Sequence, residues 1–296
     1  MSNSLTLDLI TFDPGGDFTS AMEFAERVIS TVERSWESGA DLVLLPEFMW
    51  LGMSPHLAVA PSEPLRNVAE YFWKELLPIL QERFSAPGKA VVLGTVPFIL
   101  PDSQIHNRAV IFADGQMFHQ DKLHLTPWEN AFSPGEELRL WQFGSFLIAV
   151  IICLDIEIPE LSARLRDSAV DLILCPSATE TILGVERVNR CASARSVELG
   201  CYVGVSHLTG HSTYELIDEN VGRTALYRPS QAAFRREPRS VETEIVSCGS
   251  QTMRVILDRH PLEVMRRMKS ETNPSMLGQK IAGIERLIHI KSPTSH

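Results

Sequence analysis

Short apolar runs recur along the chain and alternate with longer stretches whose apolar residues fall at helical spacing. The short runs are rich in Val, Ile and Leu, which is typical of strands buried on both faces, and the longer stretches are typical of amphipathic helices. The expected strands are residues 5–12, 41–45, 90–96, 107–112, 117–121, 146–152, 171–175, 201–206, 243–246 and 253–257. The expected helices are residues 17–39, 64–84, 159–168 and 184–198. This alternation predicts an α/β fold.

The second half of the chain repeats the pattern of the first. Residues 171–175 read Asp-Leu-Ile-Leu-Cys and are followed by Pro176, whereas residues 41–45 read Asp-Leu-Val-Leu-Leu and are followed by Pro46. This repetition indicates two similar layered halves. Basic residues outnumber acidic ones after Pro261, so we expect residues 1–262 to form the main domain. Residues 263–296 would then be a tail that packs on a neighbouring subunit or stays partly loose.

The overall charge and the cysteines exclude several classes of protein. A formal net charge of −10, without a cluster of Lys and Arg among aromatic residues, argues against a nucleic-acid partner. The five cysteines show no CxxC spacing, which argues against a disulfide framework and a structural zinc site. The histidines have no ligand-like spacing either, so we expect neither a metal nor another cofactor.

The sequence also carries no signal for a membrane. Residues 1–8 contain neither a basic segment nor an apolar core of a signal peptide, and no apolar run approaches the roughly 18 residues of a membrane span. We therefore expect a cytoplasmic protein.

The segment from Phe146 to Glu160 contains the first candidate for chemistry. Seven apolar residues form a strand that stops at Cys153, and Pro159 begins a helix. Open α/β folds bind ligands at the carboxyl ends of their strands, where the amide groups of the next helix would also lower the pKa of a thiol. The alternative is that Cys153 is a packing residue, because free cysteines are usually buried as small apolar groups.

Two further charged residues have a comparable position. Glu47 directly follows the buried strand 41–45, and Lys122 follows the expected hairpin that ends at residue 121. Their segments, Leu-Pro-Glu-Phe and Lys-Leu-His-Leu, together with Ile-Cys-Leu-Asp-Ile-Glu-Ile-Pro-Glu around Cys153, resemble the carbon-nitrogen hydrolase, or nitrilase, superfamily. The resemblance extends from about Leu5 to about Asp258. It implies a four-layer αββα sandwich, without a cofactor, that assembles into a homodimer or a larger homo-oligomer through an outer helical face.

The resemblance and the chemistry of amide cleavage assign the same roles. Cys153 would attack the carbonyl carbon and hold the acyl group as a thioester, while Glu47 would act as general base and acid. Lys122 and the backbone N–H of Leu154 would stabilise the oxyanion. Glu129 would orient Lys122, although a surface carboxylate is the alternative interpretation.

Departures from the family pattern bear on the substrate. Cys153 is followed by Leu154 and Asp155, whereas nitrilases have Trp and Glu, so a nitrile is disfavoured. Carbamoyl amino-acid hydrolases use arginines after the nucleophile to hold a carboxylate, which Ile156 and Glu157 cannot do. If Glu157 faces the pocket, it favours a neutral or cationic amide. If it pairs with an arginine, Arg187, Arg190 or Arg195, it belongs to the scaffold instead.

The sequence thus predicts an amidase that releases ammonia or an amine from a small-molecule amide. Trp128 and Thr179 are candidates for walls of the substrate pocket, with Glu180 on the same rim as Thr179. Two alternatives stay open. One is an N-acyltransferase in which an amine replaces water, and the other is a non-catalytic binding member of the family.

Overall fold

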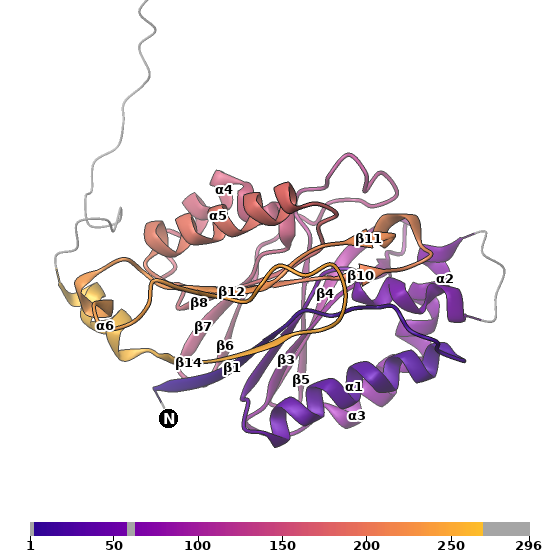
Figure 1. Cartoon of the computed structure of the whole chain (residues 1–296), viewed down its shortest axis with the longest axis horizontal. Helices are drawn as coiled ribbons and strands as arrows, with labels where there is room; N and C mark the ends of the chain where they lie inside the picture. Colours follow the sequence, from indigo (N-terminus) through magenta and orange to yellow (C-terminus); the bar gives the residue numbers. More distant parts are fainter. Residues whose placement is uncertain (1–2, 58–62, 269–296) are drawn as a thin grey trace, which may run out of the picture.

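The computed structural model describes residues 3–57 and 63–268, which form two six-stranded sheets packed face to face (Figure 1). The first sheet has the order β14-β1-β2-β3-β4-β5 and the second the order β13-β12-β9-β8-β7-β6. The strands of the first sheet are β1 (Ser4–Ile10), β2 (Leu42–Leu45), β3 (Ala90–Ile99), β4 (Ile105–Ala113), β5 (Gln116–Asp121) and β14 (Thr252–Asp258). Those of the second are β6 (Leu140–Phe143), β7 (Phe146–Val150), β8 (Leu172–Ser177), β9 (Tyr202–His207), β12 (Thr224–Tyr227) and β13 (Ser240–Glu242).

Helices cover the outer face of each sheet and complete four layers (Figure 1). The first sheet is covered by α1 (Ala21–Glu37), α2 (Pro64–Tyr71) and α3 (Leu77–Arg83), and the second by α4 (Pro159–Leu165) and α5 (Ile182–Leu199). The sequence prediction of an αββα sandwich is therefore confirmed.

The alternation of side chains along β2 shows why the layers stack in this way. Leu42 and Leu44 pack in the core between the two sheets, whereas Val43 and Leu45 pack against the covering helices. All four side chains are fully buried, each worth about 1.5–3 kcal/mol of transfer free energy. A strand buried on both faces reads as a continuous apolar run, which is why the pattern was visible in the sequence.

The two halves have matching topologies, as the repeated sequence pattern predicted. Strands β1, β2 and β3 are parallel neighbours in the first sheet, and β7, β8 and β9 are parallel neighbours in the second. Each half thus presents loops at the carboxyl ends of parallel strands, where ligands bind in open α/β folds.

Some predicted elements differ from the observed ones. The helix expected at 64–84 is continuous, but it contains a π-helical turn at Phe72–Leu76 between α2 and α3. The prediction of a strand at residues 243–246 is wrong. Strand β13 ends at Glu242, and Val246 rejoins the sheet only through an isolated bridge to Gly222. Between the pairs Ala225–Glu242 and Gly222–Val246, residues 243–245 lie opposite residues 223–224, so this side of the ladder has one extra residue. The ladder is therefore interrupted as at a β-bulge.

The last described helix crosses the boundary expected at residue 262. Helix α6 (His260–Arg267) is tied to the domain, since Arg266 Nη1 donates to Asp171 Oδ1 at 2.6 Å. The rest of the expected tail, residues 269–296, lies outside the described residues. Within the described part of the chain, every helix is too short or too polar to cross a membrane.

Candidate active site

Glu47 lies directly after β2 and is held there by the neighbouring strand β3. A bulge in β3 places Gly94 at a φ of +60°, where a Cβ atom would lie 1.9 Å from the carbonyl oxygen of Pro46. Thr95 Oγ1 accepts the backbone N–H of Phe48 at 2.9 Å. Only glycine permits this approach of the two backbones. The bulge therefore fixes the position at which the Glu47 side chain leaves the sheet.

Lys122, which follows β5, forms the centre of a buried group of charges. Its Nζ atom lies 2.8 Å from Glu47 Oε1 and 2.8 Å from Glu129 Oε2, and the three side chains are at most 2% exposed. Glu129 also accepts the backbone N–H of Thr126 at 2.8 Å. Glu129 is therefore not a surface carboxylate, and it shares the ammonium of Lys122 with Glu47.

Asn107 of β4 contacts all three of these residues. Its Nδ2 atom donates to Glu47 Oε1 at 2.9 Å and to Glu129 Oε1 at 3.4 Å, while its backbone oxygen accepts the N–H of Lys122 at 2.9 Å. The sequence placed Asn107 at the start of an expected strand and gave it no role in the site. The available signal was an amide side chain at the start of a strand expected to be buried, because a buried amide needs hydrogen-bond partners.

Cys153 lies beyond the carboxyl end of β7, at the start of the 3₁₀ helix Cys153–Glu157. Its φ of 45° is in the left-handed region, which costs a non-glycine residue about 1 kcal/mol or more and is common at functional sites. The thiol donates to the carbonyl oxygen of Ala178 at 3.5 Å, and the N–H of Ala178 donates to Glu47 Oε2 at 3.1 Å. Ala178, just after β8, thus links the thiol to the carboxylate, a role that the sequence did not suggest.

Asp155 joins the turn after Cys153 to the segment that carries Lys122. Its carboxylate is 2% exposed and accepts the backbone N–H groups of Leu123 at 3.0 Å and His124 at 2.8 Å. Leu154 lies between Cys153 and Asp155 in the first turn of the 3₁₀ helix, where backbone N–H groups have no acceptor within the helix. This N–H is therefore available for a ligand in the cavity that Leu154 lines.

Burial and neighbouring charges set the protonation of the site. Desolvation raises the pKa of Glu47 to about 7, against the opposing effect of Lys122. Burial disfavours the charge of Lys122, but Glu47, Cys153 and Glu129 together raise its pKa above the usual value. Burial and the charge of Glu47 also raise the pKa of Cys153 well above its usual value. The expected lowering of this thiol pKa was wrong, because desolvation and a nearby carboxylate outweigh the cation.

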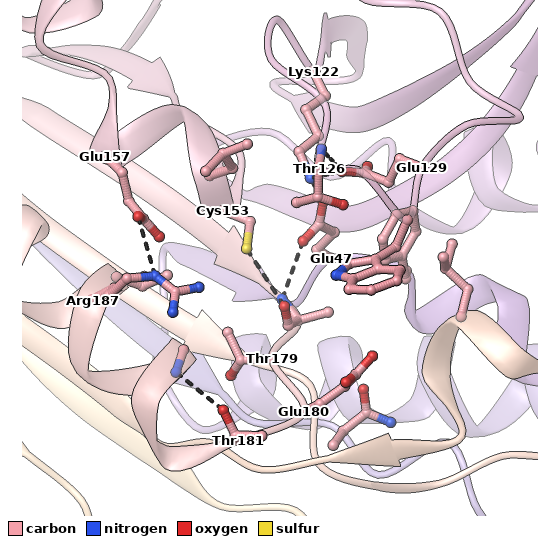
Figure 2. A pocket seen from close by; sticks show the side chains of 18 residues that line it. Glu47, Lys122, Thr126, Glu129, Cys153, Glu157, Thr179, Glu180, Thr181 and Arg187 are labelled. Carbon is pink, nitrogen blue, oxygen red and sulfur yellow. Dashed lines mark hydrogen bonds and ion pairs between the residues drawn. The ribbon is translucent and has the colours of Figure 1, made fainter.

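A cavity of about 240 Å³ opens above Cys153, Glu47 and Lys122 (Figure 2). The predicted wall residues Trp128, Glu157 and Thr179 all line it. Trp128 is 75% exposed, while the hydroxyl of Thr179 donates to the carbonyl oxygen of Val221 at 2.8 Å. The structure therefore brings the predicted catalytic residues and the predicted wall residues to one place.

Glu157 satisfies both interpretations drawn from the sequence. It lines the cavity, and its Oε2 atom lies 3.3 Å from Nε of Arg187, which lines the same cavity from α5 (Figure 2). Arg190 and Arg195 pair instead with Glu186 and Glu198. The charge of Glu157 is thus balanced inside the cavity by Arg187.

A sequence profile described as carbon-nitrogen hydrolase matches residues 11–253. The chain belongs to the carbon-nitrogen hydrolase family. A probable hydrolase of Bacillus subtilis is 28% identical over 253 residues, which make up 83% of this chain and 48% of that protein. The chain therefore spans about half the length of this relative.

Solved structures of the nitrilase superfamily share the fold of this carbon-nitrogen hydrolase. Yeast Nit3, described as a member of branch 10 of that superfamily, has a TM-score of 0.69 and 21% identity, with 92% of this chain and 96% of Nit3 covered. An amidase from Nesterenkonia has a TM-score of 0.67 and 19% identity, with 89% and 95% covered. The resemblance drawn from the sequence is confirmed.

Proposed function

We propose that this protein hydrolyses the carbon-nitrogen bond of a small, non-peptide amide through a thioester on Cys153. The observation that carries the proposal is that Glu47, Lys122 and Cys153 meet at the floor of one cavity, where Glu47 pairs with Lys122 and is linked to the Cys153 thiol through Ala178. Amide cleavage needs a nucleophile, a proton carrier and an oxyanion donor, and these three side chains supply them. Family membership supports the reaction class.

The raised pKa of Cys153 favours attack assisted by a general base over attack by a preformed thiolate. Because the pKa of Cys153 is raised, its thiol keeps its proton until the sulfur attacks the carbonyl carbon, and Glu47 accepts that proton during attack. Lys122 Nζ and the Leu154 N–H would stabilise the oxyanion. Collapse of this intermediate breaks the carbon-nitrogen bond, and Glu47 returns the proton to the leaving nitrogen.

Hydrolysis of the thioester completes the cycle with the same carboxylate. Glu47 removes a proton from water, which attacks the thioester carbonyl and forms the acid. The proton then passes from Glu47 to the departing sulfur, so the resting thiol and carboxylate are restored.

Solved structures with a similar fold support an amide as the substrate. The Nesterenkonia amidase is described with butyramide bound to one variant, and with acrylamide added to its active-site cysteine in another.

We predict that kcat/KM on a neutral amide falls on the acid side of about pH 7. Glu47 works as a base only when ionised, and its pKa is raised to about 7, so the rate should fall about tenfold for each further unit of acidification. A pH–rate profile between about pH 5 and 9 on an uncharged substrate measures this limb. The charge of Glu129 raises the pKa of Glu47, so Glu129→Gln should move the limb to lower pH. A flat profile, or an unmoved limb in Glu129→Gln, would contradict the assignment of Glu47.

Trapping the acyl-enzyme tests the proposed function directly. Rapid acid quench during turnover of butyramide should leave an acyl group on the peptide that contains Cys153, detectable by mass spectrometry. Turnover in hydroxylamine should give a hydroxamate alongside the acid. An acyl adduct that yields product only when an amine is added would establish the N-acyltransferase alternative. Tight binding of amides with neither adduct nor product would identify a non-catalytic binding protein.

A further inference from the structure

The charged side chains that line the catalytic cavity pair with one another, except for Glu180. Lys122 is bound between Glu47 and Glu129, and Arg187 is bound to Glu157. Among the described residues, no hydrogen bond or ion pair engages the carboxylate of Glu180, which follows β8 and is exposed. Figure 2 shows Glu180 on the side of the cavity away from Glu157 and Arg187. The cavity mouth therefore carries one unbalanced negative charge at a defined position.

A second cavity of about 600 Å³ adjoins the first at this position. Three residues, Trp128, Glu180 and Leu216, line both cavities. The indole of Trp128 is 75% exposed, so its ring face is open to a ligand that extends from one cavity into the other. The other charged residues that line the second cavity, Glu215, Asp218 and Glu219, are all acidic. A group that occupies this space meets an aromatic ring and a negative potential.

We propose that Glu180 and Trp128 receive a cationic group of the substrate, an ammonium or a guanidinium, while its amide lies against Cys153. This inference rests on the proposed amidase function and specifies its substrate class. A cation here would pair with the free carboxylate of Glu180 and lie on the indole, two interactions that strengthen as the ligand excludes water. A carboxylate in the same space would face four acidic side chains without a basic partner among the lining residues.

Arg187 defines the competing possibility, because its guanidinium also reaches the catalytic cavity. Its charge is already opposed by Glu157 at 3.3 Å, so a substrate carboxylate would have to compete with an existing ion pair. Glu180 has no such competitor. The balance of charge therefore favours a substrate cation over a substrate anion.

The test compares three primary amides of equal chain length that end in an ammonium, a methyl group or a carboxylate. The wild-type enzyme should prefer the ammonium amide over the methyl amide by about tenfold in kcat/KM, as expected for one charge-assisted hydrogen bond. Glu180→Gln should remove this preference, so that the ammonium and methyl amides are turned over with similar kcat/KM. Trp128→Leu should reduce the preference by about threefold, because the cation–π contact is lost and apolar contact remains.

Glu244→Gln is the matched control, since Glu244 is another exposed carboxylate and lines neither cavity. It should keep the full preference. Binding of the ammonium amide to Cys153→Ala, measured by calorimetry with and without Glu180→Gln, reports the same contact without turnover.

Two outcomes would overturn the inference while leaving the amidase function intact. One is equal turnover of the ammonium and methyl amides by the wild type, and the other is loss of the preference in Glu157→Gln but not in Glu180→Gln. Preference for the carboxylate amide that is lost in Arg187→Gln would assign the opposite substrate class. If none of the amides is turned over but the ammonium amide binds Cys153→Ala through Glu180, the proposed hydrolysis fails and the cation site stands.

Discussion

Cys153→Ala and Cys153→Ser are expected to lower amide turnover by about 10⁴-fold or more, as for other enzymes that lose their nucleophile. Alanine cannot form a thioester, and the hydroxyl of serine is far less acidic than a thiol, so Glu47 would not activate it well enough. The fold should survive, because the buried sulfur contributes only about 1 kcal/mol of transfer free energy. Steady-state kinetics on a neutral amide, with a thermal melt of each variant, measure both quantities.

Cys248→Ser is the control for this prediction, because Cys248 is the exposed member of the five cysteines. It should keep full activity, and it also removes the most exposed thiol from labelling experiments. In Cys248→Ser, iodoacetamide should label Cys153 at a rate that falls with the protonation of Glu47. Retention of more than about a hundredth of the wild-type rate by both Cys153 variants is incompatible with a covalent mechanism at this residue.

Lys122→Met is expected to damage both catalysis and stability. Loss of an oxyanion donor lowers kcat by about 10²–10³-fold, and loss of the shared cation leaves Glu47 and Glu129 buried without a counter-charge. Breaking a buried ion pair in this way costs about 3–5 kcal/mol of the free energy of unfolding. Lys122→Arg should be nearly as inactive, because a planar guanidinium cannot replace a compact ammonium between two carboxylates.

The double variant Lys122→Met, Glu129→Gln separates the two effects. It removes one of the uncompensated carboxylates, so much of the lost stability should return, as measured by denaturant unfolding. Activity should stay low, because no cation faces the oxyanion. Recovery of activity together with stability would show that Lys122 is a structural residue, and an active Lys122→Arg would lead to the same conclusion.

The sequence predicted which residues meet at the floor of the cavity because each follows a recognisable strand. Glu47 and Cys153 come after apolar runs, and the hairpin before Lys122 has a clear turn signal at Asp114-Gly115. Strand identity is a local property, set by residues that are contiguous in the chain. The prediction of a strand at residues 243–246 was wrong because its pairing depends on the position of β12, which is about twenty residues away in the sequence.

The protonation of the site could not be predicted in the same way. The amide groups of the following helix were expected to lower the pKa of the Cys153 thiol, but burial and Glu47 raise it. Desolvation depends on everything that packs around a group, and most of those neighbours are distant in sequence. The proposed mechanism therefore keeps Glu47 as the general base, as the sequence predicted, and does not need a preformed thiolate.

By itself, the sequence determined the α/β architecture, the family and the residues that carry the proposed chemistry. Apolar periodicity and short motifs depend only on residues that are close together in the sequence. Only the tertiary structure decided which charges remain unpaired. Ala178 meets a carboxylate 131 positions away, Asn107 joins three charged residues, and Arg187 neutralises Glu157, whereas Glu180 pairs with none of the described residues. Pairing requires atoms to lie within a few ångströms, a condition that folding imposes and sequence spacing does not reveal.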